Sequence, residues 1–388
     1  MNLENMINDN VRNMPPSGIR KYFDMINEMD DVISLGVGEP DFVTPWNVTE
    51  AGIYSLEKGQ THYSSNAGFI ELRREISNYL NRRFNLKYRP EDEILVTVGG
   101  SEGIDLALRT LVGPGDEVII PEPSFVAYKG CTAFTGATPV VLNLREEDEF
   151  KLTPKMLEEA ITPNTKVVII PFPNNPTGAI MTREELAEIV EVLKDKNVII
   201  ISDEIYAELS YDKNHVSIAS FDEVKDKTLV INGFSKAYAM TGWRLGYVCG
   251  NETLVSAMTK IHQYGIMSSP TTAQFAAIEA LKNADDSVNE MTREYNRRRR
   301  VLVDGLRKLG LDCFEPLGAF YVFPCIKGTG FNSDEFCEKL LMEEKVLVVP
   351  GNAFGDCGEG FIRVCYASSM ENIMESLKRI ERFVSKYK

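Results

Sequence analysis

Histidine is scarce in the sequence and cysteine shows no paired spacing, and both observations exclude certain kinds of site. The chain contains only three histidines in 388 residues, His62, His215 and His262, and they are widely separated. We therefore expect no metal site, since zinc sites need clustered histidine and cysteine ligands. The seven cysteines form no Cys-x-x-Cys pair and are odd in number. This usage favours reduced thiols and a cytoplasmic location.

Positive charge and long apolar runs are also scarce. The chain has 42 Lys and Arg against 57 Asp and Glu, a net charge of -15. Nucleic acid is therefore not an expected partner, because its phosphates require clustered cations. The one basic block, at 297–300, lies near Glu290, Glu294 and Asp304 in a helical stretch, and we expect it to form a solvated helix face. We expect no signal peptide in the first ten residues and no membrane helix, which needs ~18–20 apolar residues.

The middle of the chain alternates short apolar runs with amphipathic stretches. Strands are expected at 94–98, 117–120, 167–170, 198–201 and 229–231. Helices are expected at 104–111 and at 182–194, where Thr182 to Glu185 has the capping-box pattern. Such alternation predicts an α/β fold in which helices cover both faces of a mostly parallel sheet.

Beyond residue 285 the pattern changes to α+β. A long charged helix at 286–309 is followed by short strands at 319–323, 346–349 and 361–365 and by a C-terminal amphipathic helix. We therefore predict an N-terminal arm that joins the small domain (1–45), a large domain (46–285) and a C-terminal small domain (286–388).

Polar residues follow three of the predicted strands, and Lys236 is the most informative of them. In open α/β sheets, ligands bind outside the carboxyl ends of the strands. A desolvated lysine forms Schiff bases with aldehydes, and Arg244, eight residues later, has the planar fork that suits phosphate. One cofactor carries both groups, pyridoxal 5′-phosphate (PLP). A lysine at a helix start and a surface arginine are the alternative for the segment taken alone.

Other strand-end residues fit the remaining parts of the same cofactor. Asp203 ends an apolar strand, where a carboxylate is costly unless it is paired, and it would hold a pyridine nitrogen protonated. Tyr206 and Asn175 are candidates for the phenolic oxygen, and Phe125 for the ring face. The segment 99–101, Gly-Gly-Ser, would supply free N–H groups to a phosphate. Taken singly, these residues are also typical of a cap, a turn and a core aromatic.

These motifs, taken in order from Gly38-Glu39-Pro40-Asp41-Phe42 to the segment around Arg363, resemble the class I/II PLP-dependent aminotransferases of fold type I, the aspartate and aromatic aminotransferase-like group. The resemblance covers nearly the whole chain. It implies a large domain with a seven-stranded, mostly parallel sheet and a smaller α+β domain. It also implies a homodimer, in which Tyr63 reaches the phosphate bound by the other subunit.

The resemblance also implies a role for each matching residue. Lys236 would be the Schiff-base lysine and proton carrier, with Asp203 and Tyr206 as its catalytic partners. The cofactor would be held by Gly100, Ser101, Phe125, Asn175, Asp203, Tyr206, Ser235, Lys236, Arg244 and Tyr63, and the substrate by Gly38, Asn175, Arg363 and Ile19.

The implied reaction moves an amino group from an L-amino acid to a 2-oxo acid, 2-oxoglutarate in most of the family, in two half-reactions. Some aspartate-using relatives carry a lysine where this chain has Ser101. Ile19 and Tyr321 lie in segments that line the substrate side chain, which favours aromatic or apolar donors, whereas Arg20 would suit a distal carboxylate. The donor class therefore stays open between aspartate, aromatic and broad. A PLP-dependent β-C–S lyase of the same fold is the alternative enzyme, and a non-catalytic PLP-binding regulator would need a DNA-binding module that the sequence does not offer.

Overall fold

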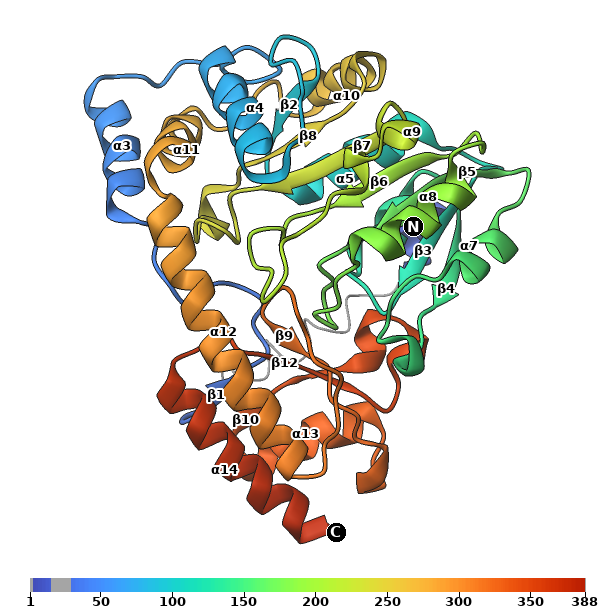
Figure 1. The fold of residues 1–388 in the computed structure, drawn as a ribbon, viewed down its shortest axis with the longest axis vertical. Coiled ribbons are helices and arrows are strands. Elements are labelled where there is room, and N and C mark those ends of the chain that lie inside the picture. Colours follow the sequence, from blue (N-terminus) through green and yellow to red (C-terminus); the bar gives the residue numbers. More distant parts are fainter. Residues whose placement is uncertain (1–2, 15–28, 388) are drawn as a thin grey trace.

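A seven-stranded sheet forms the centre of the structure, a computed structural model that describes residues 3–14 and 29–387 (Figure 1). The strand order is β2-β8-β7-β6-β5-β3-β4. All strands run in one direction except β8, which is antiparallel to both neighbours. The strands are β2 (Ile94–Thr97), β3 (Glu117–Glu122), β4 (Thr138–Asn143), β5 (Thr165–Ile170), β6 (Ile199–Asp203), β7 (Thr228–Gly233) and β8 (Gly246–Cys249). The predicted α/β fold with a mostly parallel sheet is confirmed.

Helices cover both faces of this sheet because its central strands are apolar on both sides. In β5, Val167 and Ile169 pack into the cluster that contains α5 (Gly100–Leu111) and α10 (Glu252–Gly265). Val168 and Ile170 pack on the opposite face, with the apolar residues of α8 (Arg183–Leu193). Strands buried on both faces appear in sequence as continuous apolar runs, the pattern from which they were predicted. The capping box predicted at Thr182 and Glu185 is present and begins α8.

The other described helices of this half of the chain complete the layers. They are α1 (Asp9–Arg12), α3 (Trp46–Glu57), α4 (Ile70–Phe84), α6 (Ala127–Phe134), α7 (Pro154–Ala160), α9 (Asp222–Lys225) and α11 (Thr271–Asn283). The cluster between α4, α11 and strands β2 and β8 forms a third apolar core on the edge of the sheet.

The C-terminal part is a smaller α+β unit to which the long helix α12 (Asp285–Lys308) leads (Figure 1). It contains α13 (Ser333–Glu344), α14 (Met370–Tyr387) and an antiparallel sheet of order β11-β12-β9. These strands are β11 (Val349–Pro350), β12 (Ile362–Cys365) and β9 (Tyr321–Val322). Near the N-terminus, β1 (Ile33–Ser34) pairs in parallel with β10 (Val346–Leu347). The domain boundaries at 45 and 285 stay a prediction.

The basic block in α12 is not the solvated face that we expected. Arg298 and Arg299 are buried, with 7% and 1% of their surface exposed. Arg298 binds both carboxylate oxygens of Asp41 at 2.8 Å. Arg299 donates to Asp212 at 2.9 Å and also binds Glu315. The expectation was wrong because neighbouring helical residues point about 100° apart, so that four in a row cannot share one face.

Arg299 should be a large contributor to stability. Its guanidinium is buried, so Arg299→Ala removes a packed side chain and one of the two arginine partners of each carboxylate. Arg300 still binds Asp212, and Arg307 still binds Glu315. Because Asp212 and Glu315 are nearly half exposed, water replaces part of the lost interaction, and we expect a loss of about 2–3 kcal/mol rather than the full cost of breaking a buried pair. Urea unfolding would measure this. Arg297→Ala, on the exposed face of the same helix, is the control and should leave the transition unchanged; equal losses in both variants would contradict the assignment.

Among the helices of residues 3–14 and 29–387, none has the length and apolarity to span a membrane. The same residues contain no cluster of three His, Cys, Asp or Glu side chains suited to a metal ion. All seven cysteines are free thiols.

Candidate active site

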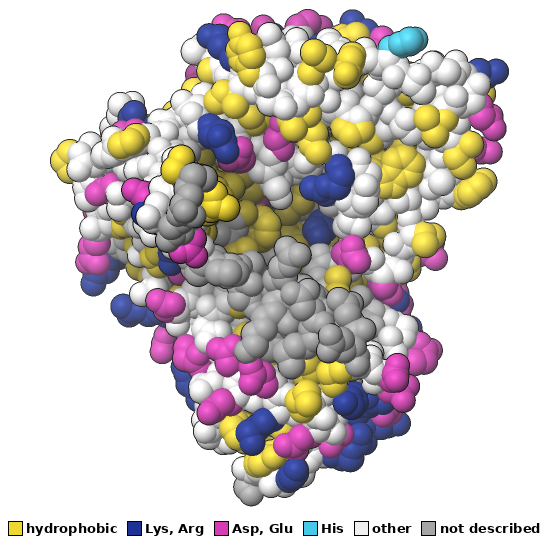
Figure 2. All heavy atoms as spheres, turned by 180° about the vertical axis from the view of Figure 1, so that it is seen from behind, with side chains coloured by type: hydrophobic (Ala, Val, Ile, Leu, Met, Phe, Trp, Pro, Cys, Tyr) yellow, Lys and Arg dark blue, Asp and Glu magenta, His cyan; other side chains and the backbone are white. Residues whose placement is uncertain are grey.

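A cavity of 380 Å³ opens at the carboxyl edge of the central sheet. Its walls come from the loops after β5, β6 and β7, from the first turns of α5, and from β9 and β12 of the smaller unit. Figure 2 shows the molecule from behind, with a hollow between its upper and lower parts. The predicted site residues that line the cavity are Gly38, Gly100, Ser101, Phe125, Asn175, Asp203, Tyr206, Ser235, Lys236, Arg244 and Arg363.

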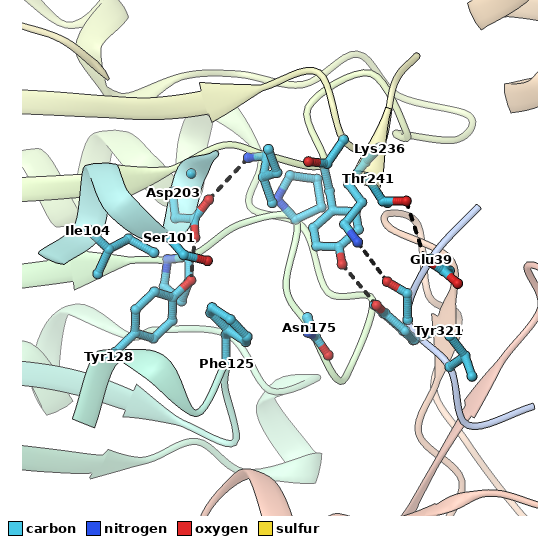
Figure 3. Close-up of a pocket in the computed structure, with 18 of the residues that line it drawn as sticks. Glu39, Ser101, Ile104, Phe125, Tyr128, Asn175, Asp203, Lys236, Thr241 and Tyr321 are labelled. Atoms are coloured by element: carbon cyan, nitrogen blue, oxygen red, sulfur yellow. Dashed lines mark hydrogen bonds between the residues drawn. The ribbon is translucent and has the colours of Figure 1, made fainter. Parts of the chain in front are cut away.

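Lys236 follows β7 and extends its side chain into the middle of the cavity (Figure 3). Its Nζ donates a hydrogen bond of 2.6 Å to the Gly38 carbonyl and lies 5.8 Å from the centre of the Tyr206 ring. No carboxylate among the described residues forms an ion pair with it. Burial therefore lowers the pKa of Lys236 to about 8, and the Arg363 charge acts in the same direction. Near neutral pH this amine is far closer to its nucleophilic form than an ordinary lysine is.

Asp203, the last residue of β6, is a buried carboxylate without a cationic contact at hydrogen-bonding distance among the described residues. Its oxygens accept hydrogen bonds from the Tyr128 hydroxyl at 2.7 Å and from the Ile205 N–H at 3.2 Å. Burial raises the pKa of Asp203, because two neutral donors do not replace the lost hydration. A cation placed against this carboxylate would be strongly favoured.

Arg363, on β12, is an almost fully buried cation at the opposite end of the cavity. It donates to Asn175 Oδ1 at 3.0 Å and to the Gly36 carbonyl at 2.5 Å. Its Nε has no hydrogen-bond partner among the described residues. Its Cζ lies 4.5 Å from the centre of the Tyr321 ring, so that this ring packs against the guanidinium. A buried guanidinium with a free donor and no carboxylate is suited to bind an anion, a carboxylate above all.

Two tyrosine hydroxyls contact each other inside the cavity. The Tyr206 and Tyr321 oxygens lie 2.9 Å apart, and both rings are buried. A side chain at position 38 would collide with the Tyr321 hydroxyl, which explains why glycine is needed there. Figure 3 shows Tyr321 and Glu39 at one end of the cavity and Asp203 and Tyr128 at the other, with Lys236 between them.

The turn from β2 into α5 forms an anion-binding cup. Gly99 has a φ of +80°, a conformation that favours glycine, and a Cβ there would lie 2.8 Å from Arg244 Nη2. The backbone N–H groups at the start of the 12-residue helix α5 have no intrahelical acceptors. Ser101, Ser235 and Arg244 line the same cavity. Free N–H groups, hydroxyls and a guanidinium around one point suit a phosphate.

Among the described residues, the predicted site residue that does not line this cavity is Tyr63. It lies in the loop between α3 and α4, with 79% of its surface exposed. Ile19 lies outside the described residues, as does Arg20. The sequence analysis did not identify Tyr128, which lies in the first turn of α6 and reaches Asp203 from there. It also missed Thr241, which donates to Glu39 at 3.2 Å on the cavity rim.

Comparisons with known proteins agree with this chemistry. Residues 30–380 match the family described as aminotransferase class I and II. A putative aminotransferase of Bacillus subtilis, YugH, is 52% identical over 98% of both chains. An aspartate aminotransferase of Pyrococcus abyssi is 42% identical and covers 98% of this chain and 99% of its own.

Solved structures give the same result. The aspartate aminotransferase from Thermus thermophilus with maleate has a TM-score of 0.92 at 36% identity, over 97% of this chain and 99% of its own. The aromatic aminotransferase from Pyrococcus horikoshii OT3 has a TM-score of 0.90 at 40% identity, over 95% of this chain and 99% of its own. The family match spans most of the chain, and the sheet, the buried lysine and the anion cup accord with it. The chain therefore belongs to the class I and II aminotransferases, PLP-dependent enzymes of fold type I.

Proposed function

We propose that this enzyme transfers the amino group of an L-amino acid to a 2-oxo acid, preferably 2-oxoglutarate, in two half-reactions that share one cavity. The observation that carries the proposal is the position of Lys236, a buried amine with a pKa lowered to about 8, between an unpaired carboxylate and an unpaired guanidinium. PLP supplies an aldehyde and an electron-accepting ring when it is bound.

The residues around the cavity fit this cofactor. Asp203 lacks the cation that a protonated ring nitrogen would provide, and Tyr128 holds its carboxylate in place. Lys236 is near enough to neutral to react with the aldehyde. We assign the phenolic oxygen to Tyr206 and Asn175, the ring face to Phe125, and the phosphate to Gly100, Ser101, Ser235 and Arg244.

The chain's own groups then account for the proton movements. Arg363 binds the substrate carboxylate with its free Nε and an Nη, and Gly38 and Asn175 border the same end of the cavity. This contact orients the Cα–H bond towards Lys236. As a neutral amine, Lys236 would take the proton from Cα onto Nζ and would give it back to the bound reactants later in the same half-reaction. The carboxylate of Asp203 would balance the charge of a protonated ring nitrogen. Tyr321 and Arg363 of the smaller unit form part of the cavity wall and limit access of water.

The lowered pKa of Lys236 predicts a pH dependence for loading of the cofactor-free protein. At pH 8 about half of this lysine is neutral, against about 0.4% of an ordinary lysine with a pKa of about 10.4. The rate constant for capture of PLP, followed by stopped-flow absorbance, should rise through pH 8 and level off above it. A model lysine peptide, as control, should show a midpoint near 10, and the same midpoint in the protein would contradict the prediction.

The same pKa has a consequence for stability with a defined sign. Between about pH 8 and pH 10.4 the unfolded chain binds more protons at Lys236 than the folded chain does. The contribution of this group to the stability of the cofactor-free protein therefore increases as pH rises through that interval.

The amino donor is proposed to carry an aromatic or apolar side chain, with aspartate as the competing class. Within the described residues, the cavity contains three cations, Lys236, Arg244 and Arg363, and each already has an assigned partner. Ile104 and Tyr321 add apolar or neutral surface, and the other charged side chains of the wall, Glu39 and Asp203, are acidic. A panel of donors against 2-oxoglutarate tests this proposal. Turnover of aspartate above phenylalanine and tyrosine would overturn it, and release of pyruvate and ammonia from cystathionine without a 2-oxo acid would instead favour the β-C–S lyase.

The proposal includes a homodimer. Tyr63, Tyr264 and Trp46 have 79%, 90% and 69% of their surface exposed. The segments that carry the two tyrosines adjoin each other, because Asn66 donates to the Met267 carbonyl at 2.8 Å and Thr271 to that of His62 at 2.7 Å. Large exposed aromatic side chains on adjacent segments are typical of a subunit interface. A cytoplasmic location, favoured by the reduced cysteines, belongs to the same proposal.

Mixing two impaired variants tests whether active sites are shared. Lys236→Ala and Tyr63→Ala each damage a different half of one site if Tyr63 acts across the interface. A hybrid dimer then contains one site with both changes and one with neither, so activity should return on mixing the two after mild dissociation. If Tyr63 acts within its own subunit, or if light scattering finds a monomer, no activity returns.

A further inference from the structure

A buried pair, Glu102 and His262, lies directly behind the anion cup. His262 is in the last turn of α10 and is completely buried. Its Nδ1 lies 2.7 Å from Glu102 Oε1, and its Nε2 has no partner among the described residues. The ring therefore has one polar contact, and that contact is to a residue in the first turn of α5.

The second oxygen of the Glu102 carboxylate binds the backbone of the turn that forms the anion cup. Oε2 accepts a hydrogen bond from the Val98 N–H, at the point where β2 turns into α5. Thr97 secures the same turn by donating from its hydroxyl to the Gly99 carbonyl at 2.9 Å. One carboxylate thus connects α10 to the turn that presents the N–H groups of residues 100 and 101.

The charge of Glu102 would be a disadvantage without His262. A carboxylate in the first turn of a helix is attracted to the free N–H groups at that end, the groups that a phosphate needs. Held by the imidazole on one side and by Val98 on the other, the carboxylate points away from the cup. Released from His262, it is free to turn towards those N–H groups and to compete with a bound anion.

We propose that Glu102 and His262 are a positioning pair that sets the affinity of the cup for phosphate without touching the cofactor. The inference rests on the proposed assignment of the cup to the PLP phosphate. It predicts that damage to the pair weakens binding of a phosphorylated ligand and spares the same ligand without its phosphate.

The experiment compares the affinity of the cofactor-free protein for PLP and for pyridoxal, which has the same aldehyde and ring but no phosphate. His262→Leu keeps the volume and removes the contact, and we expect PLP binding to weaken about tenfold, the effect of one lost hydrogen bond to a charged group, while pyridoxal binding is unchanged. Inorganic phosphate should compete with PLP more weakly by a similar factor. His262→Asn, which keeps an N–H donor near the Nδ1 position, should restore most of the affinity.

Glu102→Gln gives a second measurement if His262→Leu does not fold. Its amide oxygen can accept from the Val98 N–H, but its NH2 group then faces His262 Nδ1, so the ring must change tautomer and bury an Nε2–H without an acceptor. An intermediate, phosphate-dependent loss of about threefold is therefore expected. An equal loss for PLP and pyridoxal in these variants would mean a merely structural role, and no loss would mean no role; either result overturns the inference. If the wild-type protein itself binds PLP no better than pyridoxal, the assignment of the cup fails instead.

Discussion

Lys236→Ala should lower kcat by about 10⁴-fold or more, the largest effect expected from any single substitution in this protein. The change removes both the amine that reacts with the aldehyde and the base that takes the α-proton. The anion cup, Asp203 and Arg363 are untouched by it, so the variant should still bind PLP noncovalently. Turnover in a coupled assay and cofactor content by absorbance would measure the two effects separately.

A chemical experiment on the wild-type protein complements this variant. Borohydride reduction of the loaded enzyme, followed by peptide mapping, should attach the cofactor to the peptide that contains Lys236. Lys236→Arg keeps the positive charge but not the nucleophile and should be as inactive as the alanine variant. Near-normal turnover in either variant, or a reduced adduct on another lysine, would refute the proposed role of Lys236.

Asp203→Asn should have the second largest effect. A carboxylate and a ring cation about 4 Å apart interact by about 4 kcal/mol at an effective dielectric constant of 20, which corresponds to about three pKa units on the ring nitrogen. Asparagine preserves the shape and an acceptor for the Tyr128 hydroxyl, so the change removes mainly charge. We expect kcat to fall by about 10³-fold, measured at saturating cofactor.

Tyr128→Phe is the matched control for Asp203. It removes one neutral hydrogen bond from the carboxylate and leaves its charge, so a loss of only about fivefold to tenfold is expected. The relative size of the two effects distinguishes charge from positioning. If Tyr128→Phe were as slow as Asp203→Asn, this end of the cavity would act by positioning rather than by charge.

The central strands were predictable because their burial on both faces leaves continuous apolar runs. The two strands of the central sheet that were not predicted, β4 and β8, lack that signal. In β4, at the sheet edge, all residues are at least partly exposed and one is Pro139. In β8, only four residues separate Leu245 from Gly250, and its antiparallel direction depends on the pairing with β2 and β7.

Some residues of the candidate site were predictable from sequence, and others were not. Residues that follow strands, such as Lys236 and Asp203, could be placed at one edge of the sheet from sequence alone. Tyr128 could not, because its hydroxyl reaches Asp203 only through the packing of α6 against the sheet. The burial of Arg298 and Arg299 also depends on contacts with residues far away in the chain, which a local charge pattern does not contain.

The pairing of β1 with β10 has a consequence for biosynthesis. β1 leaves the ribosome long before its partner, because about 310 residues separate the two strands in the sequence. The large sheet has all of its strands well before that point. Its folding can therefore precede completion of translation, whereas the part that carries Arg363 must wait for the final residues. Nascent chains that end before β10 should therefore fold the part of the site that contains Lys236, but they lack Arg363, the residue assigned to the substrate carboxylate.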